Sequence, residues 1–179
     1  MPRFTEETAE CHVLTFKEGV LSKLAHDLLL KVTRFSVDVE LENSHVGASF
    51  DASSLRVVTA MLKGEPNPTA LTDKQKNEIE ENICKQVLLP DRFPEIHFVG
   101  SRLEPTEEGF SIQGRLHLFG TIGELSATTF VDAGRQRTEV EINQSDYGIK
   151  PFRAIMGAFK VKSMVKVVLS IPFGTEETA

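Results

Sequence analysis

The chain has 179 residues, of which 40% are hydrophobic and 26% are charged, the composition of a globular protein rather than a disordered one. Twenty Lys and Arg against 26 Asp and Glu leave a net charge of −6, which argues against a general nucleic-acid binder because such proteins carry a basic face. Two cysteines exclude a disulfide framework and most cysteine-based zinc sites. We expect a single domain spanning residues 1–179.

The segment Met1–Glu7 lacks the apolar stretch of a signal peptide and carries acids where such a peptide carries bases. No stretch of the chain approaches the roughly 18 consecutive apolar residues of a membrane-spanning helix. We therefore expect a cytoplasmic protein without stable membrane insertion.

Early in the chain, apolar and polar residues alternate strictly over residues 35–42, the pattern of a half-buried strand. A short turn at Asn43 and Ser44 leads to a second strand. The apolar faces of the two strands consist of Phe35, Val37, Val39 and Leu41, and of Val46, Ala48 and Phe50. These two runs predict a β-hairpin.

The middle of the chain contains the main helical signal. Thr72 is a candidate N-cap, and Ile79, Ile83 and Val87 follow at helical spacing before Pro90 ends the pattern. We expect a helix from Asp73 to about Lys85.

Alternation returns over residues 110–118, 139–142 and 160–171, whereas the register between 122 and 131 is ambiguous and suggests a bulge or a change of role. A shorter helical turn is expected over Glu18–Leu24, and a long loop over Tyr147–Ala158. About eight to ten strands with one main helix predict an all-β fold, an antiparallel sandwich or barrel.

The sequence holds no motif of a nucleophilic, phosphate-binding or metalloprotease site, and Cys84 is expected to be a packed or idle cysteine. If the strands around residues 104–109 pair symmetrically, His97 faces His117. Both histidines alternate with apolar residues and would lie on the solvated face, so we expect no metal. His26 opens an apolar strand, where either a structural role or a place at a cavity mouth fits.

Twelve Phe, one Tyr and no Trp point to an apolar interior. Six of the phenylalanines fall on different predicted strands: Phe16, Phe35, Phe50, Phe98, Phe110 and Phe130. They fit equally a solid aromatic core and a barrel wide enough to enclose a hydrophobic ligand.

Four segments together give the chain a family resemblance. They are Val46–Leu55, Phe93–Phe98, Gly114–Gly120 with Ser145–Ile149, and the strand that begins at His26. In this order the chain resembles the YceI-like family, lipocalin-like proteins known as polyisoprenoid-binding, over about residues 12–172. The resemblance implies an extended antiparallel β-barrel that encloses a long apolar channel.

The function implied by the resemblance is non-catalytic binding or sequestration of a long-chain apolar molecule, namely an isoprenoid quinone, a polyprenyl phosphate or a fatty-acid derivative. No cofactor is expected beyond such a lipid, and the only further partner considered is a second copy in a homodimer. The alternatives are a solid-core interaction module and, less favoured, a hydrolase or isomerase of a hydrophobic substrate.

The inward-facing positions of the alternating strands predict which residues line the channel. His26 and the irregular loop predict the contacts with a polar headgroup. The predicted wall is Phe35, Val37, Val39, Val46, Ala48, Phe50, Phe98, Ile112, Leu116, Leu118, Val140, Ile142, Val165 and Val167. The predicted headgroup contacts at the mouth are His26, Lys150 and Arg153.

Overall fold

A computed structural model describes residues 2–19, 25–154 and 159–172 of the chain. Within these residues the protein is dominated by antiparallel strands, most of which join in one 12-stranded sheet of order β1-β5-β6-β9-β10-β11-β12-β15-β2-β4-β7-β8. Three short strands, β13, β14 and β3, form a second sheet. The all-β fold with one main α-helix is therefore confirmed.

The elements of the structure have the following bounds. The strands are β1 (Arg3–Thr5), β2 (Glu10–Thr15), β3 (Lys17–Glu18), β4 (Asp27–Val32), β5 (Phe35–Glu40), β6 (His45–Asp51), β7 (Leu55–Leu62), β8 (Glu65–Asn67), β9 (Glu95–Pro105), β10 (Phe110–Leu118), β11 (Thr121–Asp132), β12 (Arg135–Asn143), β13 (Arg153–Ala154), β14 (Phe159–Val161) and β15 (Met164–Pro172). The helical elements are α1 (Asp73–Asn82), the π-helical turn η2 (Ile83–Leu88) and the 3-10 turn η3 (Gln144–Tyr147).

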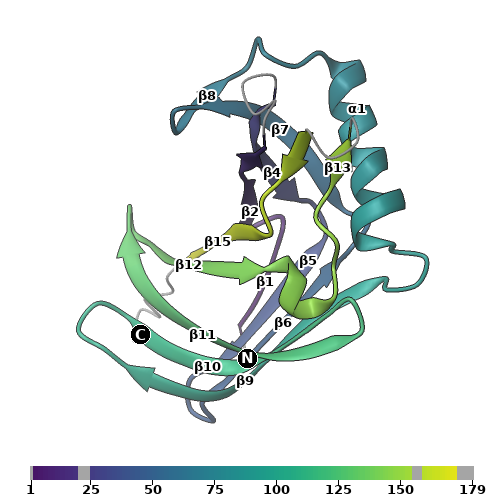
Figure 1. Cartoon of the computed structure of the whole chain (residues 1–179). Helices are drawn as coiled ribbons and strands as arrows, with labels where there is room; N and C mark the ends of the chain where they lie inside the picture. The colour runs from purple at the N-terminus through teal and green to yellow at the C-terminus, as the bar shows by residue number, and fades with distance from the viewer. Residues whose placement is uncertain (1, 20–24, 155–158, 173–179) are drawn as a thin grey trace.

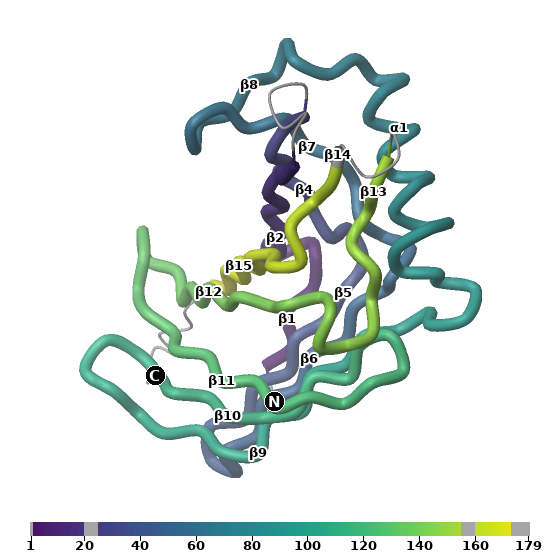
Figure 2. Tube along the Cα trace, viewed as in Figure 1, coloured from purple at the N-terminus to yellow at the C-terminus, as the bar shows by residue number. Residues whose placement is uncertain are grey.

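The large sheet curls strongly, so that the fold is a lipocalin-like half-barrel (Figure 1). Strands β5, β6, β9, β10 and β11 form its lower layer, and β2, β4 and β7 rise above them. Helix α1 stands beside the upper part, next to β7, and the Cα trace of Figure 2 follows the same course. The two parts of the curled sheet thus face each other, and α1 stands at one side of them.

The curl originates in a long hairpin that bends sharply. Strand β4 pairs with β7, and β5 pairs with β6, while only residues 33–34 and 52–54 connect the two pairs. These two connections lie side by side, since the Thr33 amide donates to Ser54 O at 3.0 Å and the Asp51 amide donates to Arg34 O at 3.1 Å. We call residues 33–34 and 51–54 the corner.

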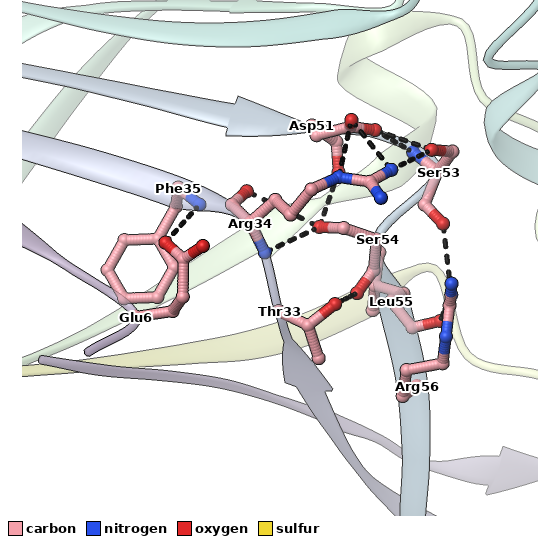
Figure 3. Close-up of polar contacts among 9 residues, drawn as sticks. All are labelled: Glu6, Thr33, Arg34, Phe35, Asp51, Ser53, Ser54, Leu55 and Arg56. Carbon is pink, nitrogen blue, oxygen red and sulfur yellow. Dashed lines mark hydrogen bonds and ion pairs between the residues drawn. The ribbon is translucent and has the colours of Figure 1, made fainter.

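Side-chain hydrogen bonds fix the corner (Figure 3). The Ser54 hydroxyl, which is fully buried, accepts from the Arg34 amide at 3.2 Å and donates to Asp51 O at 2.8 Å. The Asp51 carboxylate accepts from the amide and hydroxyl of Ser53 at 2.7 and 2.6 Å and pairs with the Arg34 guanidinium at 2.8 Å. The backbone amide and carbonyl groups of Arg34 and Ser54, which the bend takes out of strand pairing, therefore all have hydrogen-bond partners.

Two close approaches between glycine and an aromatic ring shape the lower layer. A Cβ atom at Gly114 would lie 2.5 Å from Cζ of Phe98, and one at Gly123 would lie 2.7 Å from the Tyr147 hydroxyl. Phe98 and Tyr147 can pack on the inner face only because these positions carry no side chain.

Most of the expected elements are present. The Thr72 hydroxyl accepts from the Gln75 amide at 3.3 Å, and the Gln75 side chain accepts from the Thr72 amide at 2.9 Å, a complete capping box. The hairpins β5–β6 and β9–β10 form as predicted. The ambiguous stretch 122–131 is one continuous strand, β11, which pairs with β10 up to Thr128 and with β12 from Thr129.

Two local predictions differ from the structure. Lys17 and Glu18 form strand β3 rather than the start of a helical turn, because they pair with β14, and residues 20–24 lie outside the described residues. The predicted loop 147–158 contains the end of η3 and strand β13, and its residues 155–158 also lie outside the described residues. Strands of two or three residues are too short to produce a recognisable alternation.

The close contacts at Gly114 predict that adding one methyl group there lowers the stability of the fold more than adding one at a more open glycine. A Cβ at Gly114 would collide with the backbone oxygen of Val99 and with the Phe98 ring, so Gly114→Ala should lower the free energy of unfolding by about 1–3 kcal/mol. Gly47→Ala is the matched control, since a Cβ there would meet its nearest atom at 3.5 Å. Urea unfolding of both variants measures the difference, and equal stabilities would contradict the packing described.

The Asp51 pairing predicts a contribution to acid stability. Partial desolvation raises the pKa of Asp51, but the hydrogen bonds from Ser53 and the contact with Arg34 outweigh it and hold the pKa below its usual value. Because the folded pKa is depressed, the stabilisation is present above the unfolded pKa and is lost as the pH falls through the folded pKa. Asp51→Asn should therefore lower the urea midpoint at pH 7 and flatten its fall towards pH 3 compared with wild type. Parallel midpoint curves for the two proteins would show that the corner carboxylate does not contribute.

Candidate functional site

The space inside the curled sheet is a cavity of about 540 Å³ that is bordered by α1 and η2. Apolar side chains make up most of its wall: Val13, Leu28, Leu30, Val32, Phe50, Leu55, Leu71, Ile79, Ile83, Val87, Leu88, Ile96, Leu116, Leu118, Ile142, Ile149, Phe152, Ala154, Val161, Val165 and Val167. They come from both layers of the sheet, from α1 and η2, and from the segment after η3. Ligand pockets typically occupy about 300–1,000 Å³ and have such walls.

Helix α1 forms one side of the cavity without being buried in the core. None of its residues is buried, and its cavity side carries Gln75, Glu78, Ile79 and Asn82. These positions recur at spacings of three and four residues, which places them on one face of a helix. The cavity is therefore lined on this side by a partly polar, partly exposed helical surface.

The opposite side of α1 is attached to the edge of β7. Lys76 Nζ donates to Val58 O at 2.9 Å, and the Val57 amide donates to a Glu80 carboxylate oxygen at 2.8 Å. Glu80 also lies 3.8 Å from the Arg56 guanidinium. Strand β8 pairs only with residues 60–62 of β7, so α1 supplies hydrogen-bond partners to the part of the strand that β8 does not reach.

The remaining wall residues of the cavity are polar or ionisable. They are Cys11, Thr15, His26, Asp51, Gln75, Glu78, Asn82 and Gln144. Burial raises the pKa of the Cys11 thiol to about 12, which marks the environment around this side chain as apolar. No Lys or Arg lines the cavity among residues 2–19, 25–154 and 159–172.

The structure distributes the predicted wall residues between this cavity and packed regions. Lining the cavity are Phe50, Leu116, Leu118, Ile142, Val165 and Val167. Not lining it are Phe35, Val37, Val39, Val46, Ala48, Phe98, Ile112 and Val140. Burial does not follow the alternation strictly, since Ser36 and Val168 beside predicted wall positions are buried as well, and alternation alone does not identify the cavity wall.

Packing explains why most of the second group lies away from the cavity. Phe35 and Val37 are buried in a cluster with Cys11, which Val39 and Ala48 pack against. The Phe35 ring also stacks on Phe50 at 5.9 Å between centroids, and of these two rings Phe50 lines the cavity and Phe35 does not. Phe98 packs against a second buried cluster around Tyr147.

The three predicted headgroup residues lie at two different places. The exposed His26 lines the cavity, whereas Lys150 and Arg153 line a separate pocket of about 690 Å³. Both pockets share Ile149 and Phe152 as wall residues. The two cations thus line the adjacent pocket and are not wall residues of the cavity.

The facing histidine pair has the predicted register, with His97 directly opposite His117. His97 Nε2 lies 3.0 Å from a Glu95 carboxylate oxygen. Among the described residues no group of three or more His, Cys, Asp or Glu side chains is arranged to hold a metal ion. Cys84 is partly buried on η2 and is not a cavity wall residue.

Sequence reasoning missed the contribution of β2 and β4 to the cavity, notably Val13, Leu28 and Leu30. Leu14 and Leu29 alternate with them and are apolar too, so alternation did not distinguish the inner face of these strands. The helical stripe Ile79, Ile83 and Val87 was visible in the sequence, and all three residues line the cavity.

Comparison with known proteins supports the fold and identifies the family. BcnA of Burkholderia cenocepacia has a TM-score of 0.61 at 12% identity, covering 91% of this chain and 94% of its own. A polyisoprenoid-binding domain from Saccharophagus degradans has a TM-score of 0.57 at 8% identity, covering 92% and 94%. At these identities the two structures establish a common fold only.

No curated protein matches the chain. None of the described helices is long and apolar enough to span a bilayer. The family model for the YceI-like domain matches residues 13–173, which is nearly the whole chain. The four sequence segments and the curled sheet agree with this match, and the chain belongs to the YceI-like family.

Proposed function

We propose that the protein binds a long-chain apolar molecule in the cavity and carries or sequesters it without chemical conversion. The observation that carries this proposal is the cavity of about 540 Å³ with its mainly aliphatic wall. A wall of this kind recognises a hydrocarbon chain by burial, at about 0.8 kcal/mol for each methylene group removed from water.

The size of the cavity favours a ligand over a solid core. Side chains that border empty space lose dispersion contacts, and missing core volume typically destabilises a fold by a few kcal/mol. A guest molecule restores those contacts. The solid-core interaction module considered from the sequence lacks such a space, and so it explains the structure less well.

The cavity wall also gives little support to catalysis. A nucleophile needs a base within hydrogen-bond reach, and Cys11 has a pKa of about 12, which leaves the thiol protonated at neutral pH. No hydrogen bond joins Cys11 to a base in the described part of the chain. We therefore infer a binding protein rather than a hydrolase or isomerase.

The structural neighbour from Saccharophagus degradans is a polyisoprenoid-binding domain, which supports an isoprenoid chain as the guest. Isoprenoid quinones, polyprenyl phosphates and fatty-acid derivatives share a long apolar chain and differ at the polar end. The aliphatic wall accounts for the shared part.

Native mass spectrometry of the protein as purified from cells tests the proposal directly. We expect an adduct that solvent extraction releases as a long-chain lipid, and the same spectrum reports whether the chain is a monomer or a homodimer. If the protein carries no lipid and takes up none from mixed liposomes, the proposed function is wrong.

A pair of identical substitutions separates the cavity from the packed core. Val165 lines the cavity and belongs to neither buried cluster, so Val165→Phe should fill empty space, keep the fold stable and abolish lipid uptake. Val37 is 2% exposed in the packed cluster, so Val37→Phe should lower the free energy of unfolding by about 1–3 kcal/mol. Thermal melting and lipid uptake are measured on both. Equal destabilisation by the two changes would show that the space at Val165 does not accept a guest.

A further inference from the structure

We propose that the cavity selects a long-chain molecule whose polar end is uncharged and accepts hydrogen bonds, such as an alcohol, a quinone or an amide, over the same chain ending in phosphate or carboxylate. This inference rests on the proposed binding function and specifies its ligand. It is carried by the charges and hydrogen-bond donors on the cavity wall.

The first observation is the sign of the charges on the wall. Asp51 and Glu78 are its carboxylates, and no Lys or Arg joins them among the described residues. The Asp51 carboxylate is already neutralised by Arg34 at 2.8 Å, whereas Glu78 has only Lys74 at 3.9 Å. An anion entering this cavity loses water and meets no compensating cation on the described wall, which is unfavourable.

The second observation is the set of donors that α1 presents beside Glu78. The Gln75 side-chain oxygen accepts from Thr72, and the Asn82 side-chain oxygen accepts from Gln86 at 2.9 Å. The Gln75 oxygen accepts from both the amide and the hydroxyl of Thr72, and the Asn82 oxygen already holds one partner, whereas the side-chain N–H groups of Gln75 and Asn82 have no hydrogen-bond acceptor among the described residues. N–H groups of this kind suit the oxygen of a carbonyl or hydroxyl group.

The third observation is the position of the cations that an anionic headgroup would need. Lys150 and Arg153 line the adjacent pocket, which shares Ile149 and Phe152 with the cavity, and neither cation is among the residues that line the cavity. Burial, without any opposing charge among its causes, raises the pKa of Cys11 on the cavity wall to about 12. A thiolate is thus disfavoured at that position, in agreement with an interior that does not stabilise anions.

The test compares two ligands that differ only at the head. Geranylgeraniol and geranylgeranyl phosphate displace the neutral fluorophore N-phenyl-1-naphthylamine from lipid-depleted protein. The alcohol should displace it at a concentration at least about tenfold lower than the phosphate, because an unpaired buried charge is costly. Equal displacement would overturn the headgroup selectivity and leave the proposed binding function intact. If neither ligand nor the fluorophore binds, the binding function itself fails.

Two charge reversals on α1 locate the selectivity. Glu78→Lys should improve displacement by the phosphate about fivefold, since it places a cation at the partly exposed side of the cavity. Glu81→Lys is the matched control, because Glu78 and Glu81 side chains are 59% and 58% exposed, and each pairs with a lysine four residues away, but only Glu78 lines the cavity. If both variants improve displacement by the phosphate equally, the effect comes from the net charge of the protein, and the assignment to Glu78 is wrong.

A double variant examines the rival position for the headgroup. Lys150→Ala combined with Arg153→Ala should leave displacement by both ligands unchanged, because these side chains do not line the cavity. If the wild-type protein binds the phosphate tightly and this variant loses that binding, the headgroup occupies the second pocket and the proposal is wrong.

Discussion

The cavity depends on one constraint, the bend at the corner, where the long hairpin passes from the β4–β7 pair to the β5–β6 pair. Only a few residues separate the two strand pairs, so the backbone groups at the bend leave the ladder and need other partners. The buried Ser54 hydroxyl and the Asp51 carboxylate supply them. With the corner fixed, the two layers face each other across a gap that the side chains of the sheet do not fill.

The segments that carry the family resemblance are mainly those that build this shape. The stretch ending at Ser54 forms the corner, and the Ala52 amide donates to Pro94 O at 2.9 Å, which joins it to the Phe93–Phe98 segment. Gly114 makes room for Phe98 in turn. Their types are required by hydrogen bonding and close packing, which explains why these segments indicated the fold better than the ligand.

The sequence predicted what local periodicity determines. Alternation placed Phe35, Val37 and Val39 of β5 on one face, but Leu41, which was predicted to share it, is exposed in the turn after the strand. The spacing of Ile79, Ile83 and Val87 gave the helix and its apolar side. It did not predict that Phe35 would lie packed behind Phe50, because this depends on how far the sheet curls. Lys150 and Arg153 were assigned to the mouth for a related reason, since chain order does not reveal that they line an adjacent pocket instead of the cavity.

The apolar wall of the cavity and the proposed headgroup contacts lie in different parts of the molecule. The strands are paired in one sheet and the corner is fixed by the buried Ser54 and its hydrogen bonds, so substitutions at such positions alter the fold together with the site. Helix α1 has no buried residue and is attached to β7 through Lys76 and Glu80 on the side away from the cavity. Its cavity-side positions Gln75, Glu78 and Asn82 can therefore change in charge and hydrogen bonding at little cost in stability. In the proposed binding mode, the headgroup meets Gln75, Glu78 and Asn82 of one attached helix, and the apolar chain lies against the curled sheet.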